Sequence, residues 1–298
     1  MKKILITGAG GMLGAAVCRH LSHLASYEVF AAARNNNSHI TAKKTLVGDL
    51  NDSEYISELG NLDVDAVIHC AALTNIEKSE KEPETAFSIN AKATENLALQ
   101  FPQATFIYIS TDSVFDGQTE NYTEKDEPNP LNVYAQTKLS GEEAVAKANK
   151  NHYILRTNMY GFHRPPSGRS LFEWSYQNLS QGSEVGGFSN VIFNPLYVGQ
   201  IAEVIEQLIV QKPPFGIYNA TCDEPLSKFE FLQKVALKFD FAEDLIIPTE
   251  IIERPVNALR PLKTSLKNDK LVNKISSLNL TFERGLGMLY DDFSEFTK

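Results

Sequence analysis

The first half of the chain alternates short apolar runs with longer amphipathic segments. Nearly continuous runs of apolar residues occupy positions 3–7, 27–33, 65–72, 104–110 and 152–157. Such runs are typical of strands buried on both faces of a parallel sheet. Helical spacing of apolar residues appears between them, at 12–25, 52–59, 83–100 and 133–149. The alternation predicts an α/β fold with a doubly wound parallel sheet.

The alternation loosens after about residue 160. We expect a loop at 161–170, a turn and short strand at 212–220, and helices at 171–181, 196–211 and 227–239. Ser227, followed three residues later by Glu230, predicts a capping box at the start of the last helix. These pieces predict a smaller C-terminal lobe over the carboxyl ends of the strands, where open α/β sheets bind ligands. We therefore expect a dinucleotide-binding domain (1–162 and 191–218) and a substrate-binding lobe (163–190 and 219–298).

Composition and charge narrow the function classes. The formal net charge of −9 argues against a nucleic-acid partner, because that binding needs clustered Lys and Arg. The three cysteines show neither a metal-ligand spacing nor an even disulfide count, so we expect no metal site and a reducing cytosol. No window approaches the roughly 20 apolar residues of a membrane-spanning helix, and glycines interrupt the N-terminal apolar run. We expect a soluble, cytoplasmic protein without a membrane partner.

A glycine-rich turn follows the first predicted strand. In "TGAGGMLGAA" (7–16), Gly8, Gly11 and Gly14 are spaced G-x-x-G-x-x-G between a strand and a helix. This context favours a dinucleotide whose pyrophosphate meets the helix N-terminus, with a ligand-free turn as the alternative. The spacing leaves Gly10 as a turn residue.

The end of the second predicted strand indicates which dinucleotide binds. An acidic residue there hydrogen-bonds the ribose 2′-hydroxyl of NAD, whereas an arginine accommodates the 2′-phosphate of NADP. Arg34 occupies this place, and no carboxylate does. We therefore predict NADPH, with NADH possible if Arg34 is an ordinary solvated surface residue.

Residues suited to acid and base chemistry follow the strand at 104–110. "STDSVFDG" (110–117) carries Thr111, and the helix at 133–149 carries Tyr134 and Lys138 four residues apart on one face. A nearby ammonium lowers the pKa of a tyrosine by favouring the phenolate. The pair is common by chance, but together with the glycine turn it predicts a catalytic site.

With these motifs, the chain resembles an extended short-chain dehydrogenase/reductase, and within that superfamily the dTDP-4-dehydrorhamnose reductase family. The similarity spans nearly the whole chain, including "TGAGGMLG", "GDL" (48–50), "STDSVFDG", "NPLNVYAQTKLSGEE" and "RPLKTSL" (260–266). The resemblance implies a Rossmann-type fold and NADPH-dependent reduction of a nucleotide-linked 4-keto-6-deoxy sugar in surface polysaccharide biosynthesis. Hydride would pass to C4 of the sugar, and Tyr134 would protonate the developing alkoxide.

The resemblance also implies individual roles. Thr111 would hydrogen-bond the substrate carbonyl, Tyr134 would donate the proton, and Lys138 would hold the nicotinamide ribose and lower the pKa of Tyr134. The implied cofactor-binding residues are Gly8, Gly11, Met12, Leu13, Gly14, Arg34, Asp49, Leu50, Ala71, Ala72, Asn90, Tyr134 and Lys138. The implied substrate-binding residues are Thr74, Asp112, Ser113, Asn158, Asn194 and Arg260. Two of these have alternatives: Asp49 could cap the helix that begins near Asp52, and Arg260 could pair with a carboxylate of the smaller lobe.

The chain departs from the family on the sugar side, while the cofactor and catalytic motifs are intact. Ser113 stands where the family usually has Tyr, and Asn158 and Met159 lie where it often has Trp. Asn194 and Leu196 depart from the family's G-x-P-T segment, and Phe188 stands where a polar residue is common. Related 4,6-dehydratases carry Thr-Asp-Glu after the same strand, whereas this chain reads Thr-Asp-Ser, so dehydration is not expected. A nucleotide-sugar epimerase stays open as an alternative.

Two further expectations come from the resemblance. The segments at 83–100 and 133–149 resemble the helices that extended relatives pair in a dimer, so we expect a homodimer. A relative serves as the regulatory partner of methionine adenosyltransferase, so a non-catalytic NADP-binding subunit is a second alternative.

Overall fold

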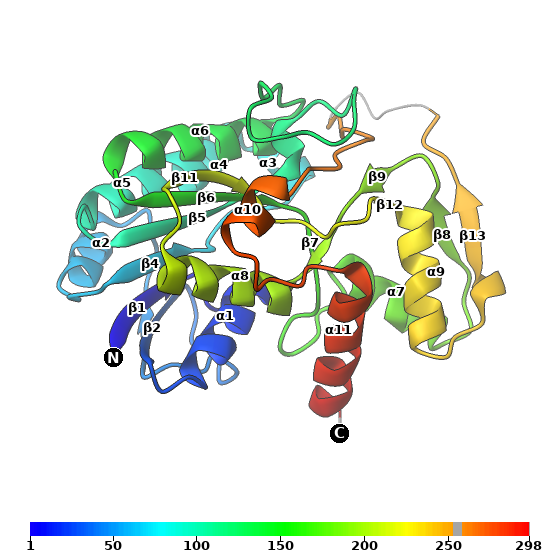
Figure 1. Cartoon of the computed structure of the whole chain (residues 1–298), viewed down its shortest axis with the longest axis horizontal. Coiled ribbons are helices and arrows are strands. Elements are labelled where there is room, and N and C mark those ends of the chain that lie inside the picture. Colours follow the sequence, from blue (N-terminus) through cyan, green and yellow to red (C-terminus); the bar gives the residue numbers. More distant parts are fainter. Residues whose placement is uncertain (253–257, 298) are drawn as a thin grey trace.

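The computed structural model describes residues 1–252 and 258–297. A seven-stranded parallel sheet with strand order β11-β6-β5-β4-β1-β2-β3 forms its centre (Figure 1). Its strands are β1 (Lys2–Thr7), β2 (Tyr27–Ala33), β3 (Lys44–Val47), β4 (Ala66–His69), β5 (Thr105–Thr111), β6 (His152–Thr157) and β11 (Gly216–Asn219). The predicted doubly wound sheet is confirmed, and the five predicted strands all belong to it.

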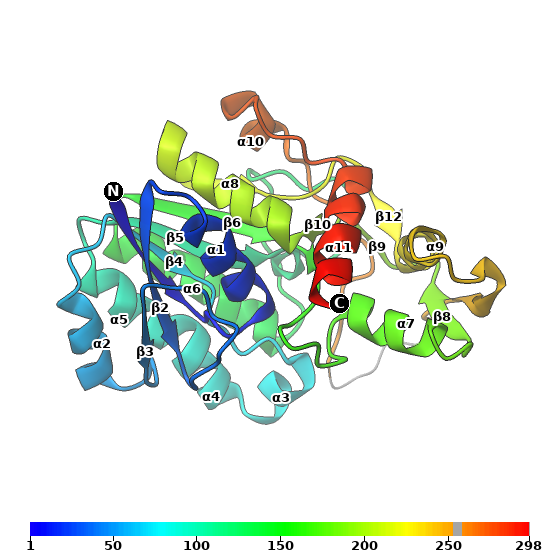
Figure 2. The same cartoon turned by 90° about the horizontal axis from the view of Figure 1, so that it is seen from below.

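Helices cover both faces of this sheet. One face carries α2 (Ser53–Gly60), α4 (Pro83–Phe87), α5 (Ala93–Gln100) and α6 (Val133–Ala148), and the other carries α1 (Met12–Ser22) and α8 (Val198–Gln211) (Figure 2). Their buried apolar residues form two clusters, one on each side of the strands. The sheet is therefore buried on both faces, which explains the continuous apolar runs of its strands.

The predicted helix at 83–100 is wrong in detail. A π-helical turn, η1 (Ser88–Lys92), separates α4 from α5, and a short helix α3 (Ile76–Lys81) precedes them. Pro83 begins α4 as an N1 residue, where its missing N–H costs nothing. The sequence analysis also missed β3, because this edge strand has only one buried residue, Leu46.

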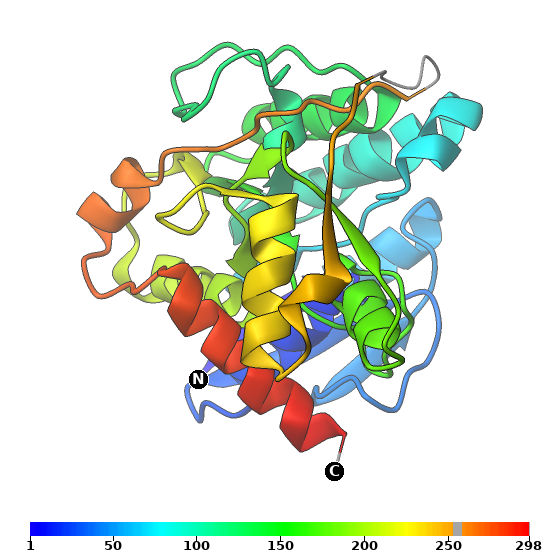
Figure 3. The same ribbon diagram turned by 90° about the vertical axis from the view of Figure 1, so that its right-hand side faces the viewer.

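The smaller part lies beside the carboxyl ends of the strands (Figure 3). It contains α7 (Leu171–Leu179), α9 (Lys228–Lys238) and two small sheets that pair β12 (Leu226–Ser227) with β9 (Ile192–Phe193) and β13 (Ile246–Thr249) with β8 (Val185–Phe188). Two short strands, β7 (Met159–Tyr160) and β10 (Leu196–Tyr197), lie where the chain passes between the parts. The capping box of Ser227 and Glu230 is confirmed.

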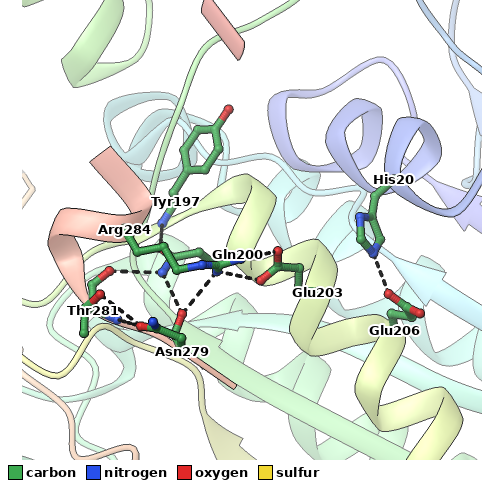
Figure 4. Close-up of polar contacts among 8 residues, drawn as sticks. All are labelled: His20, Tyr197, Gln200, Glu203, Glu206, Asn279, Thr281 and Arg284. Carbon is green, nitrogen blue, oxygen red and sulfur yellow. Dashed lines mark hydrogen bonds and ion pairs between the residues drawn. The ribbon is translucent and has the colours of Figure 1, made fainter. Parts of the chain in front are cut away.

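The last helices, α10 (Asp269–Lys274) and α11 (Phe282–Phe296), were not predicted. Arg284 of α11 pairs with Glu203 of α8, and Gln200 donates hydrogen bonds to the carbonyls of Asn279 and Thr281 (Figure 4). His20 of α1 contacts Glu206 of α8 at 2.7 Å. The C-terminal helix therefore packs against α8 of the large part as well as against α9 of the smaller part, and bridges the two predicted domains.

Candidate active site and family

The glycine turn lies at the point where the strand order reverses, between β1 and β4. Gly8 has φ of +66°, and a Cβ there would lie 2.6 Å from the backbone nitrogen of Ala71, in the loop after β4. A Cβ on Gly14 would overlap the carbonyl oxygen of Gly8, whereas one on Gly10 would meet nothing within 4 Å. Both close approaches require glycine, and they hold the loops after β1 and β4 together at the crevice where such sheets bind ligands.

The N-terminus of α1 is open to an anion. Gly11 is the N-cap residue and supplies no side-chain hydrogen bond, and the first turn contains no acidic residue. The amides of Met12 and Leu13 in this turn are therefore available to a ligand, and the helix dipole favours a negative charge there. The Leu13 side chain is buried in the core, so only its backbone could contact a phosphate.

Arg34 and Asp49 lie at the carboxyl ends of β2 and β3. The Arg34 side chain is exposed and forms no ion pair within the described part of the chain. Asp49 is also exposed and accepts a hydrogen bond from the amide of Asn51 at 2.9 Å. The N-cap of α2 is Asp52, which accepts from the amide of Glu54, so the capping alternative for Asp49 is wrong. Leu50 is partly buried beside it.

Asn90 fixes the loop after β4. It is fully buried in the π-helical turn, and its side chain bonds both the amide (2.8 Å) and the carbonyl (3.0 Å) of Leu73. Its Nδ2 also donates to the Thr137 hydroxyl of α6 at 2.9 Å. Asn90 thus connects α6 to the loop that contains Ala71 and Ala72, which supports its expected role of holding the sheet near the cofactor. Thr74, further along the loop, is exposed.

Tyr134 and Lys138 lie on α6, next to the end of β5. Asn132 caps this helix by accepting a hydrogen bond from the amide of Ala135. Lys138 is only 3% exposed, and its Nζ lies 4.0 Å from the centroid of the Tyr108 ring. Contact with the Thr111 hydroxyl acts on the ionisation of Tyr134, and Lys138 lies one turn further along the same helix.

The ionisation of the pair differs from the expectation. Burial raises the pKa of Tyr134 to about 12, and Asp112 adds to the rise, while contact with Thr111 partly opposes it. Burial lowers the pKa of Lys138 to about 7, against the opposing effects of Glu142 and Cys70. In the protein without its ligands, desolvation therefore outweighs the expected effect of the ammonium on the phenol, and Tyr134 is held protonated.

Asp112 organises the residues around Thr111. Its carboxylate accepts hydrogen bonds from Thr111 (3.1 Å), Ser113 (3.3 Å), Asn158 (2.8 Å) and Thr264 (2.5 Å). The carboxylate is buried and each oxygen takes two bonds. Asp112 thus joins the ends of β5 and β6 to the late segment around Thr264, and a direct contact with substrate would have to displace one of these bonds.

The two remaining predicted substrate residues are already engaged within the protein. Asn194 is buried, and its amide bonds Thr221, Cys222 and Leu266, which indicates a structural role rather than substrate contact. Arg260 is half exposed and pairs with Glu77 of α3. Its carboxylate partner therefore lies on the large domain, not in the smaller lobe as the alternative supposed.

Two further residues of this region, Thr264 and Lys228, were not predicted from the sequence. Thr264 reaches Asp112 from a segment more than 150 residues away along the chain. Lys228 is the first residue of α9 and lies near Asp112. No spacing signal identifies either, because only the folded chain brings them to β5. Within the described residues, no group of three or more His, Cys, Asp or Glu side chains could hold a metal ion, and no helix has the length and apolarity to cross a membrane.

Comparison with known proteins places this site in a family. The RmlD substrate binding domain family matches residues 1–295. The probable low-salt glycan biosynthesis reductase Agl14 of Haloferax volcanii is 30% identical over 298 residues, covering 98% of each chain. Methionine adenosyltransferase 2 subunit beta of Xenopus tropicalis is 31% identical, over 91% of this chain and 81% of its own. A solved dTDP-4-dehydrorhamnose reductase of Clostridium acetobutylicum has a TM-score of 0.85 at 27% identity, covering 98% of this chain and 99% of its own.

The sheet, the open helix N-terminus at its switch point and the adjoining Tyr134 and Lys138 define the class. The chain is an NAD(P)-dependent oxidoreductase of the extended short-chain dehydrogenase/reductase type. Within that class, it belongs to the RmlD substrate binding domain family.

Proposed function

We propose that the protein uses NADPH to reduce the 4-keto group of a nucleotide-linked 6-deoxy sugar, in the biosynthesis of a surface polysaccharide or glycan. The observation that carries the proposal is the group of Thr111, Tyr134 and Lys138, whose lysine lies near Cys70 in the loop that closely approaches Gly8. The cofactor fits the unliganded residues: the α1 N-terminus lacks a side-chain cap and Arg34 lacks a partner within the described chain. The Met12 and Leu13 amides would hold the pyrophosphate.

The residues divide the chemistry between them. When bound, NADPH supplies a hydride to the carbonyl carbon, and the electron pair of the C=O bond moves to the oxygen. Tyr134 donates its proton to that oxygen, and its raised pKa keeps the proton available at neutral pH. Thr111 donates a hydrogen bond to the same oxygen by turning its hydroxyl from Asp112. Lys138 would hold the nicotinamide ribose, and water would return a proton to Tyr134.

Arg34 supports the preference for NADPH. Its exposed guanidinium can pair with the 2′-phosphate, a group that NADH lacks. Arg34→Ala should raise the KM for NADPH by roughly 10- to 100-fold and leave that for NADH nearly unchanged. The matched control is Lys44→Ala, at the opposite end of the neighbouring edge strand. Steady-state kinetics with both cofactors tests this, and an equal loss for the two cofactors would refute the preference.

A panel of substrates tests the reaction itself. The protein is incubated with NADPH and 4-keto-6-deoxy sugars linked to dTDP, GDP or UDP, and the absorbance of the reduced nicotinamide is followed. The proposal expects stoichiometric oxidation with at least one member of the panel. Oxidation that persists unchanged in Tyr134→Phe would contradict the assigned proton donor.

A non-catalytic subunit is the second candidate, favoured by the similarity to methionine adenosyltransferase 2 subunit beta. In that case NADPH would bind but no sugar in the panel would be reduced. A binding measurement with a methionine adenosyltransferase catalytic subunit would then be expected to detect a complex.

We also propose that the protein is a cytosolic homodimer. Its three cysteines are free thiols, as a reducing compartment requires. An open groove between α4 and α6 is lined by Phe87, Ala91, Glu95 and Ala144, among others. Phe87 and Leu99 are 38% and 56% exposed on this face. Covering them with the same face of a second copy would remove this apolar surface from water.

A further inference from the structure

Lys228 brings a second cation to the catalytic end of β5. Ser227 caps α9, so Lys228 is the first residue of that helix, and its Nζ lies 3.1 Å from the centroid of the Phe193 ring. Asp112, the neighbour of Thr111, acts on its charge, as does Arg260. The backbone places it there: the Lys228 amide donates to the carbonyl of Val191 (3.0 Å), and the carbonyl of the next residue, Ile192, accepts from the amide of Thr264 (2.9 Å), whose hydroxyl bonds Asp112. Lys228 therefore lies at the start of α9 beside the segment that reaches the carboxylate next to Thr111.

This ammonium has no counterion among residues 1–252 and 258–297. No carboxylate there forms an ion pair with it, and its side chain has no hydrogen-bond partner. Asp112 is the acid that stabilises its charge, but both carboxylate oxygens of Asp112 already accept two hydrogen bonds each. The residue as a whole keeps some exposed surface although its ammonium is surrounded by protein atoms, so a ligand can reach it from solvent.

The arrangement is costly without an anion. Burial lowers the pKa of Lys228 to about 7; Asp112 opposes the shift and Arg260 adds to it. Lysine ammonium groups are seldom buried without a partner, because desolvation is not compensated. A cation held in this state on the wall of an active site is poised to receive an anionic oxygen, which would restore its charge and supply hydrogen-bond acceptors.

We propose that Lys228 is a substrate-binding residue that pairs with an anionic oxygen next to the reacting sugar. This inference rests on the proposed function, since it assumes a nucleotide sugar in the cleft. The oxygen belongs to the diphosphate of the nucleotide, because a 6-deoxy sugar carries no carboxylate at C6. The aromatic face of Phe193 contacts the ammonium and supplies no hydrogen-bond acceptor to it, so an anionic oxygen could accept from its N–H groups.

Three variants test the proposal. Lys228→Met removes the charge but keeps an unbranched apolar side chain over Phe193, and Lys228→Arg keeps the charge. Lys238→Met is the control, because Lys238 is an exposed lysine near the other end of α9. With NADPH present, calorimetry measures the Kd of dTDP, UDP, GDP, UDP-glucose and UDP-glucuronate, and a thermal melt checks that each variant is folded.

The pattern of losses identifies the source of the oxygen. If it is a phosphate oxygen, Lys228→Met weakens the nucleoside diphosphate that binds wild type by roughly 10- to 100-fold, and Lys228→Arg restores binding to within about threefold. A loss confined to UDP-glucuronate, with UDP and UDP-glucose unchanged, would instead point to a sugar carboxylate and would overturn the diphosphate assignment. Lys238→Met is expected to match wild type throughout.

Other results overturn the inference. The inference fails if Lys228→Met binds every probe with a Kd within threefold of wild type, or if Lys238→Met loses as much affinity as Lys228→Met. It also fails if the wild-type protein binds none of the probes. The proposed function fails separately. If no 4-keto sugar is reduced but diphosphate binding depends on Lys228, the anion site stands and the reductase does not. If turnover is normal but the Kd of the probes does not depend on Lys228, the reductase stands and the anion site does not.

Discussion

Tyr134 and Lys138 are both shifted towards their neutral forms by burial. The pKa of Tyr134 is raised to about 12 and that of Lys138 is lowered to about 7. For a reductase the first shift is useful, because the tyrosine must carry the proton it donates. The second shift means that the site holds an ammonium at a cost to the folded protein. The catalytic pair therefore favours activity over stability.

Lys138→Met should make the unliganded protein more stable while abolishing turnover. Below pH 7 the folded and unfolded states both carry the ammonium, and the folded state bears its full desolvation cost. Above the folded pKa of about 7 the folded protein releases this proton, while the unfolded chain keeps it to about pH 10.4, so the cost falls as pH rises. Methionine removes the charge and can still pack on Tyr108. At pH 6 we expect the free energy of unfolding to rise by about 1–3 kcal/mol.

Urea denaturation at pH 6 and pH 9 measures this effect. The gap between Lys138→Met and wild type should narrow at the higher pH. The control is Lys147→Met, because Lys147 is exposed on the same helix. A variant that is less stable than wild type at pH 6 would contradict the argument.

At the residue scale, the sequence predicts the candidate catalytic residues better than it predicts which distant residues contact them in the fold. Thr111, Tyr134 and Lys138 follow a strand end and share a helix face, and these features are visible in local spacing. Lys228 is not recognisable in this way, because its relation to Asp112 exists only once the chain is folded. For the same reason Asn194, which looks like a pocket residue in sequence, is a structural residue in the fold.

At the element scale, one largely buried carboxylate helps to fix α11 to the large domain. Asp292 accepts two hydrogen bonds from Arg19 of α1, at 2.9 and 2.6 Å, and one from the Tyr197 hydroxyl at 2.7 Å. Burial pushes the pKa of Asp292 upward, but the bonds from Arg19 and Tyr197 outweigh it and hold the pKa below its ordinary value. The C-terminal helix therefore depends on an ionised Asp292.

Asp292→Asn should lower the free energy of unfolding by about 1–3 kcal/mol at pH 7, because it leaves the Arg19 guanidinium without its counterion. The contribution of a carboxylate with a lowered pKa is full above its unfolded pKa of about 3.9 and is lost as pH falls below it. The difference from wild type should therefore shrink in acid. Asp291→Asn, at the exposed neighbouring position, is the control. Equal urea midpoints for the two variants at pH 7 would refute the role.

Elements were predictable where burial is regular along the chain. The central strands bury nearly every residue, so their apolar runs are unbroken. The edge strand β3 buries only Leu46, and the π-helical turn at Ser88–Lys92 changes the helical period within an apolar segment. Neither leaves a periodic pattern, so both were missed.

At the scale of the whole molecule, the exposed face of α4 to α6 predicts the oligomeric state. Phe87→Glu places a charge in the proposed dimer interface and should convert a dimer to a monomer in sedimentation velocity experiments. Val210→Glu, at a 53% exposed position on α8 across the sheet, should leave the dimer intact. A wild-type protein that sediments as a monomer would contradict the proposed dimer.

The proposed function requires the fold to place a hydride donor beside Tyr134, and hydride transfer can be followed directly. NADPH carrying deuterium at the transferred C4 position of its nicotinamide is incubated with the protein and a nucleotide-linked 4-keto-6-deoxy sugar. The account predicts one deuterium in the sugar for each NADPH oxidised, with the rate reduced by about 100-fold or more in Tyr134→Phe. An unchanged cofactor, or a sugar that is interconverted without gaining deuterium, would contradict it.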